Sequence, residues 1–127
     1  MMSHENQELS GVSFTTEPPN PFVTLERGNG SLEWRYTFGN ESFRQVTFGN
    51  TKIPRIVEFS KGDTTPWIEP LYCGRLRVKI SNNYTSITFV GVNRTDSGTH
   101  HLTVIANPSR RSKTSHLELS VHCEYNT

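Results

Sequence analysis

The stretch of sequence that decides the fold runs from residue 86 to residue 102 and reads SITFVGVNRTDSGTHHL. Its first four residues alternate polar and apolar side chains, which is the period of a half-buried β-strand. Polar and glycine residues fill positions 93–98, as in a turn, and a second strand-like run begins at His101. This stretch therefore predicts two β-strands joined by a turn.

The same alternation recurs outward from this stretch. Residues 31–37 alternate cleanly, and Leu32, Trp34 and Tyr36 share the face that we expect to be buried. No stretch shows a sustained helical period. Further strands are predicted at residues 22–25, 43–48, 54–59, 75–80, 101–105 and 116–121. An all-β chain of about eight or nine short strands is expected to form a sandwich or a barrel.

Composition supports one small domain. The chain has 127 residues, of which 32% are hydrophobic, and its 13 Phe, Tyr and Trp residues predict a thin core rich in aromatic side chains. The 28 Ser and Thr residues, 9 Gly and 7 Pro suit short strands joined by turns. We expect the domain to span residues 12–123, with residues 1–11 as an expression leader or unstructured flank and residues 124–127 as a C-terminal flank.

Charge and motifs exclude several classes of function. The net charge of +1 gives no field that would attract nucleic acid, and no apolar run approaches the ~20 residues of a membrane span. We find no catalytic motif, so the chain is interpreted as a non-catalytic domain without cofactor. His100 and His101 are neighbours on a strand and point to opposite faces, so they cannot share a metal ion. His101 and His116 are expected to meet across a hairpin as a surface pair.

Residues 86–102 resemble the strand E to strand F stretch of immunoglobulin domains, whose pattern Leu-x-Ile-x-x-Val-x-x-x-Asp-Ser-Gly-x-Tyr-x-Cys is matched at its apolar positions and at residues 96–98. Residues 74–78, GRLRV, resemble the start of strand D in variable-type domains. The resemblance implies an immunoglobulin-like antiparallel β-sandwich of the variable type. It also implies a salt bridge between Arg75 and Asp96, at the end of the sandwich away from the F–G loop.

The departures from the immunoglobulin pattern concern the centre of the sandwich. Trp34 and Leu102 stand where the strand B and strand F cysteines would be, so the usual disulfide between the sheets is expected to be replaced by an apolar contact. His100 replaces the tyrosine of the tyrosine corner. Strand C has no tryptophan, so Phe48 or Val46 must fill its place. Similar strand B sequences without cysteine occur in invertebrate cell-surface receptors, including the ectodomain of a sponge receptor tyrosine kinase.

Two cysteines remain, Cys73 and Cys123. In a variable-type sandwich, strand D starts and strand G ends at the same end of the molecule. Cys123 also shares the sequence parity of Leu117 and Leu119, which would turn its side chain inward. We therefore predict that Cys73 and Cys123 are close enough to form a disulfide, the alternative being two unrelated thiols.

The resemblance implies a recognition or adhesion module on the outside of a cell. Arg110, Arg111 and Lys113 lie at the F–G loop, which carries recognition in variable-type domains, and could bind an acidic protein or a sulfated glycan. The alternative is an ordinary solvated loop. Trp67, beside the polar loop at 61–66, is either an interface aromatic or, as we favour, a cover of the lower core. A homophilic dimer through the G–F–C sheet is a further expectation.

The expected compartment rests on a modest signal. Asn-x-Ser/Thr triplets begin at Asn29, Asn40, Asn83 and Asn93, whereas about two are expected by chance in such a composition. They favour a secreted chain or one on the extracellular side of the plasma membrane. The alternative function is a structural spacer in a tandem immunoglobulin array, including an intracellular one, where the lack of a core disulfide is normal.

Overall fold

The structure is a computed structural model that describes residues 10–123, so residues 1–9 of the expected leader (1–11) and the expected C-terminal flank at 124–127 lie outside the described residues. The first strand begins at Ser10, two residues inside the stretch expected as a leader. The elements are strands β1 (Ser10–Thr16), β2 (Phe22–Leu25), β3 (Gly30–Gly39), β4 (Ser42–Asn50), β5 (Val57–Ser60), β6 (Trp67–Ile68), β7 (Leu76–Ser81), β8 (Tyr84–Phe89), β9 (Gly98–Asn107) and β10 (Ser112–His122), with short 3₁₀ helices η1 (Pro70–Tyr72) and η2 (Arg94–Asp96).

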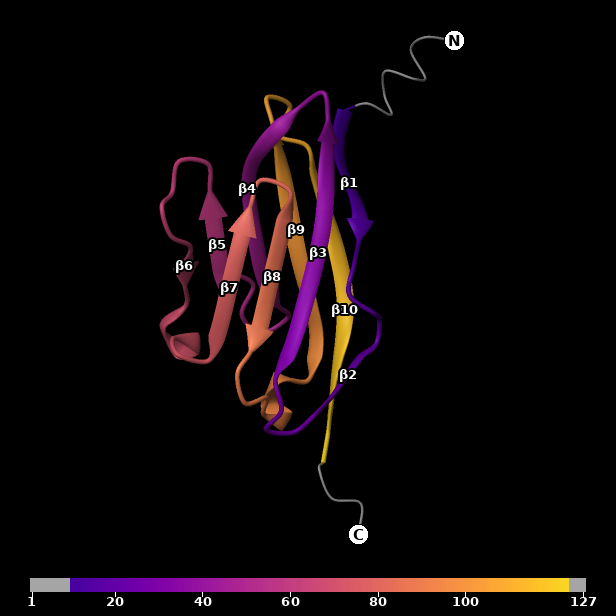
Figure 1. Cartoon of the computed structure of the whole chain (residues 1–127), viewed down its shortest axis with the longest axis vertical. Coiled ribbons are helices and arrows are strands. Elements are labelled where there is room, and N and C mark those ends of the chain that lie inside the picture. Colours follow the sequence, from indigo (N-terminus) through magenta and orange to yellow (C-terminus); the bar gives the residue numbers. More distant parts are fainter. Residues whose placement is uncertain (1–9, 124–127) are drawn as a thin grey trace.

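The strands form two sheets that pack face to face (Figure 1). One sheet has the order β1-β3-β8-β7, and the other has the order β2-β10-β9-β4-β5-β6. Neighbouring strands are antiparallel, except that β2 runs parallel to β10. The exception arises because the chain passes from one sheet to the other between β1 and β2. The fold is therefore a β-sandwich, as the strand pattern predicts.

The core lies between the sheets and follows the alternation read from the sequence. Along β3, every second residue from Gly30 to Phe38 is buried and those between them are exposed. The predicted burial of Leu32, Trp34 and Tyr36 is confirmed, and seven further apolar residues are buried with them: Ile87, Phe89, Val92, Leu102, Val104, Leu117 and Leu119. Burial of these side chains is the main stabilising contribution that the sequence pattern supplies.

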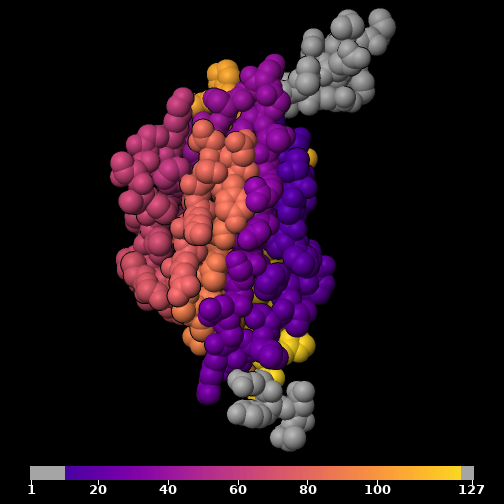
Figure 2. All heavy atoms as spheres, in the orientation of Figure 1, coloured from indigo at the N-terminus to yellow at the C-terminus, as the bar shows by residue number. Residues whose placement is uncertain are grey.

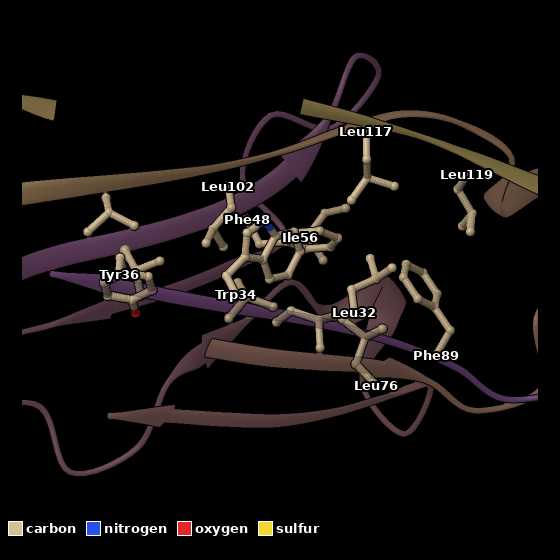
Figure 3. Packing of buried hydrophobic residues seen from close by; sticks show 14 of the residues in the cluster. Leu32, Trp34, Tyr36, Phe48, Ile56, Leu76, Phe89, Leu102, Leu117 and Leu119 are labelled. Atoms are coloured by element: carbon tan, nitrogen blue, oxygen red, sulfur yellow. The ribbon is translucent and has the colours of Figure 1, made fainter. Parts of the chain in front are cut away.

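Trp34 occupies the centre of this core. Figure 3 shows its indole ring directed toward Phe48, Leu102 and Ile56, which come from the facing sheet and the segment before β5. The ring centres of Trp34 and Phe48 are 5.9 Å apart. Phe48 of β4 thus takes the place of the missing strand C tryptophan. Trp34 and Leu102 are both fully buried, so an apolar contact fills the region where a disulfide would link the sheets.

The polar atoms of Trp34 and Tyr36 have hydrogen-bond partners. The indole Nε1 of Trp34 donates a hydrogen bond to Ser115 Oγ (3.1 Å), and that hydroxyl donates to Glu17 Oε1 (2.6 Å). The hydroxyl of Tyr36 shares a hydrogen bond of 2.7 Å with Thr85 Oγ1. Burial raises the pKa of Tyr36 to about 12, and the Thr85 bond partly opposes that shift. The hydrogen-bonding groups of these two buried aromatic side chains are therefore satisfied.

Candidate recognition site

Arg75 and Asp96 lie at the end of the sandwich that carries η2, opposite the β9–β10 loop (Figure 1); we call it the η2 end. Arg75 Nη2 donates to Asp96 Oδ2 at 2.6 Å and Nη1 to Oδ1 at 3.2 Å. The side chain of Asp96 is 2% exposed and that of Arg75 is 29% exposed. The hydrogen bond to Asp96 raises the pKa of Arg75. The backbone N–H of Asn93 also donates to Asp96 Oδ2 (2.8 Å), so this carboxylate is fully engaged in structure.

His100 lies close to this ion pair and points into the core. Its Nδ1 is 3.0 Å from the carbonyl oxygen of Gly98, a backbone bond in place of the one that a tyrosine hydroxyl would make. The ring stacks on Phe48 at 5.6 Å and meets Phe89 edge-on at 5.8 Å. Its buried Nε2 has no partner among the described residues. Burial lowers the pKa of His100, which is therefore a neutral core residue.

The predicted disulfide is wrong, because no bond joins Cys73 and Cys123 and both side chains are exposed. Cys73 follows η1 on the approach to β7, the outer strand of the four-stranded sheet. Cys123 follows β10, which lies in the other sheet between β2 and β9. The strands β7 and β10 lie toward opposite sides of the sandwich (Figure 1). The missing step in the prediction was this separation across the width of the molecule.

The inward parity of Cys123 also fails, because strand pairing ends at His122 and the side chain of Cys123 is exposed. Parity predicts the direction of a side chain only while the chain stays extended and paired. The Cys123 side chain instead forms a hydrogen bond with Arg94. That bond, followed by the charge of Glu26, raises the pKa of Arg94.

The asparagines of the four Asn-x-Ser/Thr triplets are all exposed. Asn29 accepts a hydrogen bond from the backbone N–H of Gly91 (3.2 Å), and Asn83 donates one to the carbonyl oxygen of Tyr36 (3.3 Å). Asn40 lies in the turn between β3 and β4, and Asn93 directly precedes η2. Exposure makes all four accessible, whereas their modification stays a prediction.

The β9–β10 loop (residues 108–111) projects at the opposite end, which we call the loop end (Figure 1). Arg110, Arg111 and Lys113 are all exposed, and none of the three has an ion-pair partner within residues 10–123. Arg110 adopts a positive φ of 63°, which makes the turn tight. The structure thus brings the three predicted cations together at one end of the molecule.

Hydrogen bonds hold this loop in place. Its base is closed by two backbone bonds of 2.9 Å, from Ala106 N to Arg111 O and from Arg110 N to Ala106 O. The hydroxyl of Ser109 donates to Glu41 Oε1 (2.7 Å), which ties the loop to the β3–β4 turn. An anchored loop presents its exposed cations at a lower entropic cost than a free one.

A hollow of about 270 Å³ lies at the base of this loop, and the sequence reading missed it. It is lined by Arg44 and Gln45 of β4, Ser60 and Lys61 at the end of β5, and Asn107 of β9. These side chains meet through the pairing of β4 with both β5 and β9. A signal was present in the sequence, because the inward residues Phe43 and Val46 are three apart instead of two or four.

A second hollow, of about 320 Å³, lies on the outer face of the four-stranded sheet, where β3, β7 and β8 are turned toward the viewer in Figure 2. Its lining includes the cations Arg77 and Lys79, the acid Glu33 and the ring of Tyr84. The guanidinium of Arg35 covers that ring at 4.7 Å. This hollow therefore combines charges of both signs.

Trp67 lies on β6, the outer strand of the six-stranded sheet, and covers the core only in part. Its side chain is 40% exposed, and the guanidinium of Arg55 stacks over its ring at 4.2 Å. Arg55 in turn pairs with Glu58 at 3.2 Å. The favoured interpretation of Trp67 as a cover of the lower core therefore applies to only part of the ring, and the rest is shared between Arg55 and solvent.

The remaining sequence predictions concern a histidine pair, metal binding and membrane crossing. His101 and His116 face each other across β9 and β10 with ring centres 6.4 Å apart, as a surface pair. Residues 10–123 contain no group of three or more His, Cys, Asp or Glu side chains that could hold a metal ion. Over the same range, no helix has the length and apolar character needed to cross a bilayer.

Comparison with known proteins supports the fold. No protein-family model and no curated protein matches the sequence. Among solved structures, the titin domains z1z2 in complex with telethonin match at 20% identity with a TM-score of 0.65, over 89% of this chain and 48% of that one. A mutant form of the titin M10–obscurin-like 1 Ig complex matches at 11% identity with a TM-score of 0.61, over 91% and 97%.

A chicken TCR structure matches at 12% identity with a TM-score of 0.67, over 90% of this chain and 50% of that one. This chain spans about half the length of the titin z1z2 and TCR chains. At such identities the likeness is one of fold, and it agrees with the two-sheet arrangement. The chain is therefore an immunoglobulin-like β-sandwich without a disulfide between strands β3 and β9.

Proposed function

We propose that this chain is a variable-type immunoglobulin-like recognition module on the outside of a cell, and that it binds an acidic protein or glycan ligand through its loop end. The strand order supports the variable type, because β5 and β6 extend the sheet beyond β4 in the way that the two extra strands of variable domains do. In that class the loops at one end of the sandwich carry the binding site. The parent protein would be a cell-surface receptor, including a receptor tyrosine kinase whose kinase lies elsewhere.

The observation that carries the proposal is the contrast between an anchored loop and its exposed charges. Arg110, Arg111 and Lys113 are exposed and lack ion-pair partners in the described chain, whereas the loop backbone is fixed by bonds at Ala106 and Ser109. A fixed positive patch attracts an acidic partner and orients it.

An extracellular location is the second part of the proposal. It is supported by the exposure of Asn29, Asn40, Asn83 and Asn93, since a glycan can be attached only where the acceptor is accessible. It does not depend on a disulfide, because the contact of Trp34 with the facing sheet closes the core without one.

A homophilic dimer through the outer face of β10, β9 and β4 is the less favoured mode of binding. That face carries the hydroxyl pair Thr103 and Thr114 (2.8 Å) and the rings of His101 and His116. Such a polar surface lacks the aromatic centre typical of stable interfaces. Sedimentation of the purified protein at high concentration tests for this dimer.

The alternative function is a spacer in a tandem array with no ligand of its own. One observation favours it: the core is sealed by Trp34 and Leu102, so the domain suits a reducing compartment as well as an oxidising one. Under this alternative the cations at the loop end would only be solvated.

One experiment separates the two functions. The chain is secreted from a eukaryotic host, its glycans are mapped by mass spectrometry, and the protein is screened on arrays of acidic proteins and sulfated glycans. The proposal predicts glycan at one or more of the four sites and binding that is lost in the variant R110Q/R111Q/K113Q. The control variant K52Q/R77Q/K79Q removes the same charge from exposed positions elsewhere and should still bind. No glycan and no binding would favour the spacer.

A further inference from the structure

The hollow at the base of the β9–β10 loop is formed by an irregularity in β4. The pairing of β4 with β9 shifts register between Phe43 and Gln45, so Arg44 is the extra residue of a β-bulge. Phe43 and Val46 both point into the core. The bulge therefore allows two consecutive side chains, Arg44 and Gln45, to line the same hollow on the outer face.

Several contacts hold the lining side chains in place. Arg44 Nη1 donates to Asn107 Oδ1 (3.4 Å), which extends the guanidinium along the strand that leads into the loop. Gln45 Oε1 accepts a hydrogen bond from Ser60 Oγ (3.3 Å) on the other side. The backbone N–H of Lys61 donates to Arg44 O (2.8 Å), so the two cations belong to backbone segments that are bonded to each other.

The charge in this hollow is unbalanced. Its lining contains two cations, Arg44 and Lys61, and no carboxylate. Two carboxylates lie near the hollow without lining it: Asp63 accepts from the backbone N–H of the lining residue Ser60 (2.9 Å), and Glu41 accepts from Ser109. By contrast, the hollow on the four-stranded sheet contains Glu33 beside its two cations. The two hollows thus differ in charge far more than in size.

We propose that this hollow binds an acidic sugar unit, with its carboxylate or sulfate between Arg44 and Lys61 and its hydroxyls on Gln45, Ser60 and Asn107. Charge-assisted hydrogen bonds from a guanidinium and an ammonium suit such an anion. The amides and hydroxyl of the lining suit sugar hydroxyls, and all five lining residues carry polar or charged side chains. Its volume of about 270 Å³ lies just below the ~300 Å³ at which sites for drug-sized ligands begin, which favours a small ligand. The inference rests on the proposed recognition function and names its ligand class.

The test uses NMR titration of the ¹⁵N-labelled protein with four probes: glucuronic acid, N-acetylglucosamine 6-sulfate, neutral N-acetylglucosamine and an acidic peptide. Inorganic sulfate is a fifth arm that reports the anion alone. We expect saturable shifts at residues 44–45, 60–61 and 107 with the acidic sugars, and weaker binding of neutral sugar and of sulfate. Tighter binding of the acidic peptide at these residues, or equal binding of sulfate alone, would overturn the proposal.

Variants locate the binding. R44Q/K61Q should weaken binding of the acidic sugars by about tenfold or more, which corresponds to the loss of one charged hydrogen bond. K61Q alone, at an exposed side chain that cannot threaten folding, should give part of that loss. The matched control R77Q/K79Q removes the same charge from the other hollow and should change affinity less than about twofold. Equal losses in both double variants would overturn the site.

The recognition function and this site can fail separately. If R110Q/R111Q/K113Q abolishes capture of an acidic ligand while R44Q/K61Q leaves it unchanged, the loop end still recognises its ligand and the hollow is not its site. If neither variant has an effect, both proposals fall.

Discussion

The two ends of the sandwich use their charged residues in opposite ways. At the η2 end, Asp96 is buried and its oxygens are taken by Arg75 and by the backbone of Asn93. At the loop end, Arg110 and Arg111 are exposed and have no ion-pair partner in the described chain. One end therefore uses charge to stabilise the fold, and the other leaves charge available to a partner.

This difference predicts which residue changes should affect folding and which should affect only binding. A buried carboxylate that loses its cation remains desolvated and unpaired, which is costly. Removal of an exposed cation leaves no buried charge without a partner and costs little. The same residue type can thus have large or negligible effects on stability, depending on the end at which it lies. The expected change in the free energy of unfolding is largest in the core, smaller at the η2 end and smallest at the loop end.

The largest expected change in the free energy of unfolding comes from the core between the two ends. Trp34→Ala should lower the free energy of unfolding by about 3–5 kcal/mol, because a fully buried aromatic ring and its bond to Ser115 are lost. Urea denaturation monitored by circular dichroism measures the change. A loss below about 1 kcal/mol would contradict the central position of this indole.

At the η2 end, Asp96→Ala should lower the free energy of unfolding by about 2–3 kcal/mol, because Arg75 and the N–H of Asn93 lose a shared acceptor. The control is Glu58→Ala, which breaks the exposed ion pair with Arg55 and should cost less than about 1 kcal/mol. Arg75→Ala combined with Asp96→Ala should cost less than the sum of the single changes, since both remove one interaction. Equal costs in Asp96→Ala and Glu58→Ala would remove the proposed difference between buried and exposed pairs.

His100, beside the η2 end, should make stability depend on pH. Burial holds its pKa below the ordinary value of about 6.5, so the unfolded chain binds a proton at this residue more readily than the folded one. The stability that the fold has with a neutral His100 is therefore fully present above about pH 6.5. It is lost as the pH falls from there through the pKa of His100 in the folded state.

The measurement for His100 is the free energy of unfolding between neutral and mildly acidic pH, compared with His100→Phe. The phenyl ring can keep the stacking on Phe48 but cannot take up a proton. The variant should show a shallower decline on acidification. Identical slopes in the two proteins would mean that the ring accepts a proton in the folded state without penalty.

At the loop end, single changes of Arg110, Arg111 or Lys113 to Gln should each alter the free energy of unfolding by less than about 0.5 kcal/mol. Each side chain is exposed and contributes no ion pair within the described residues. Thermal denaturation of the three variants checks this. A larger loss would show that these cations support the loop, which would weaken the argument that they are held ready for a partner.

Much of the sandwich could be predicted from the sequence because alternation carries direct information about faces. Leu32, Trp34 and Tyr36 are buried as their spacing predicts, and the pair of Arg75 with Asp96 follows from the likeness of two short segments to immunoglobulin strands. Strand β1 was missed because it lies within the polar start of the chain, although Val12 and Phe14 alternate there.

The rest could not be predicted because it depends on lateral placement. Alternation states which way a side chain points, but not which strands are neighbours or which edge each occupies. The prediction that Cys73 and Cys123 form a disulfide rests on the sequence parity of Cys123 and on the end of the sandwich at which both lie. It is wrong because β7 and β10 are separated across the width of the sandwich. The hollow likewise needs the neighbours of β4, since Ser60, Lys61 and Asn107 join Arg44 only through strand pairing.

The sealed position of Trp34 also makes the protein its own spectroscopic reporter. Of its two indoles, Trp34 is enclosed in apolar side chains, whereas Trp67 is partly open to water beneath Arg55. A collisional quencher such as acrylamide should therefore remove the emission of Trp67 first. The emission that remains should come from Trp34 and be blue-shifted. Because Trp67 lies on β6 and Trp34 at the centre, one emission spectrum distinguishes loosening of the outer strand from opening of the whole sandwich.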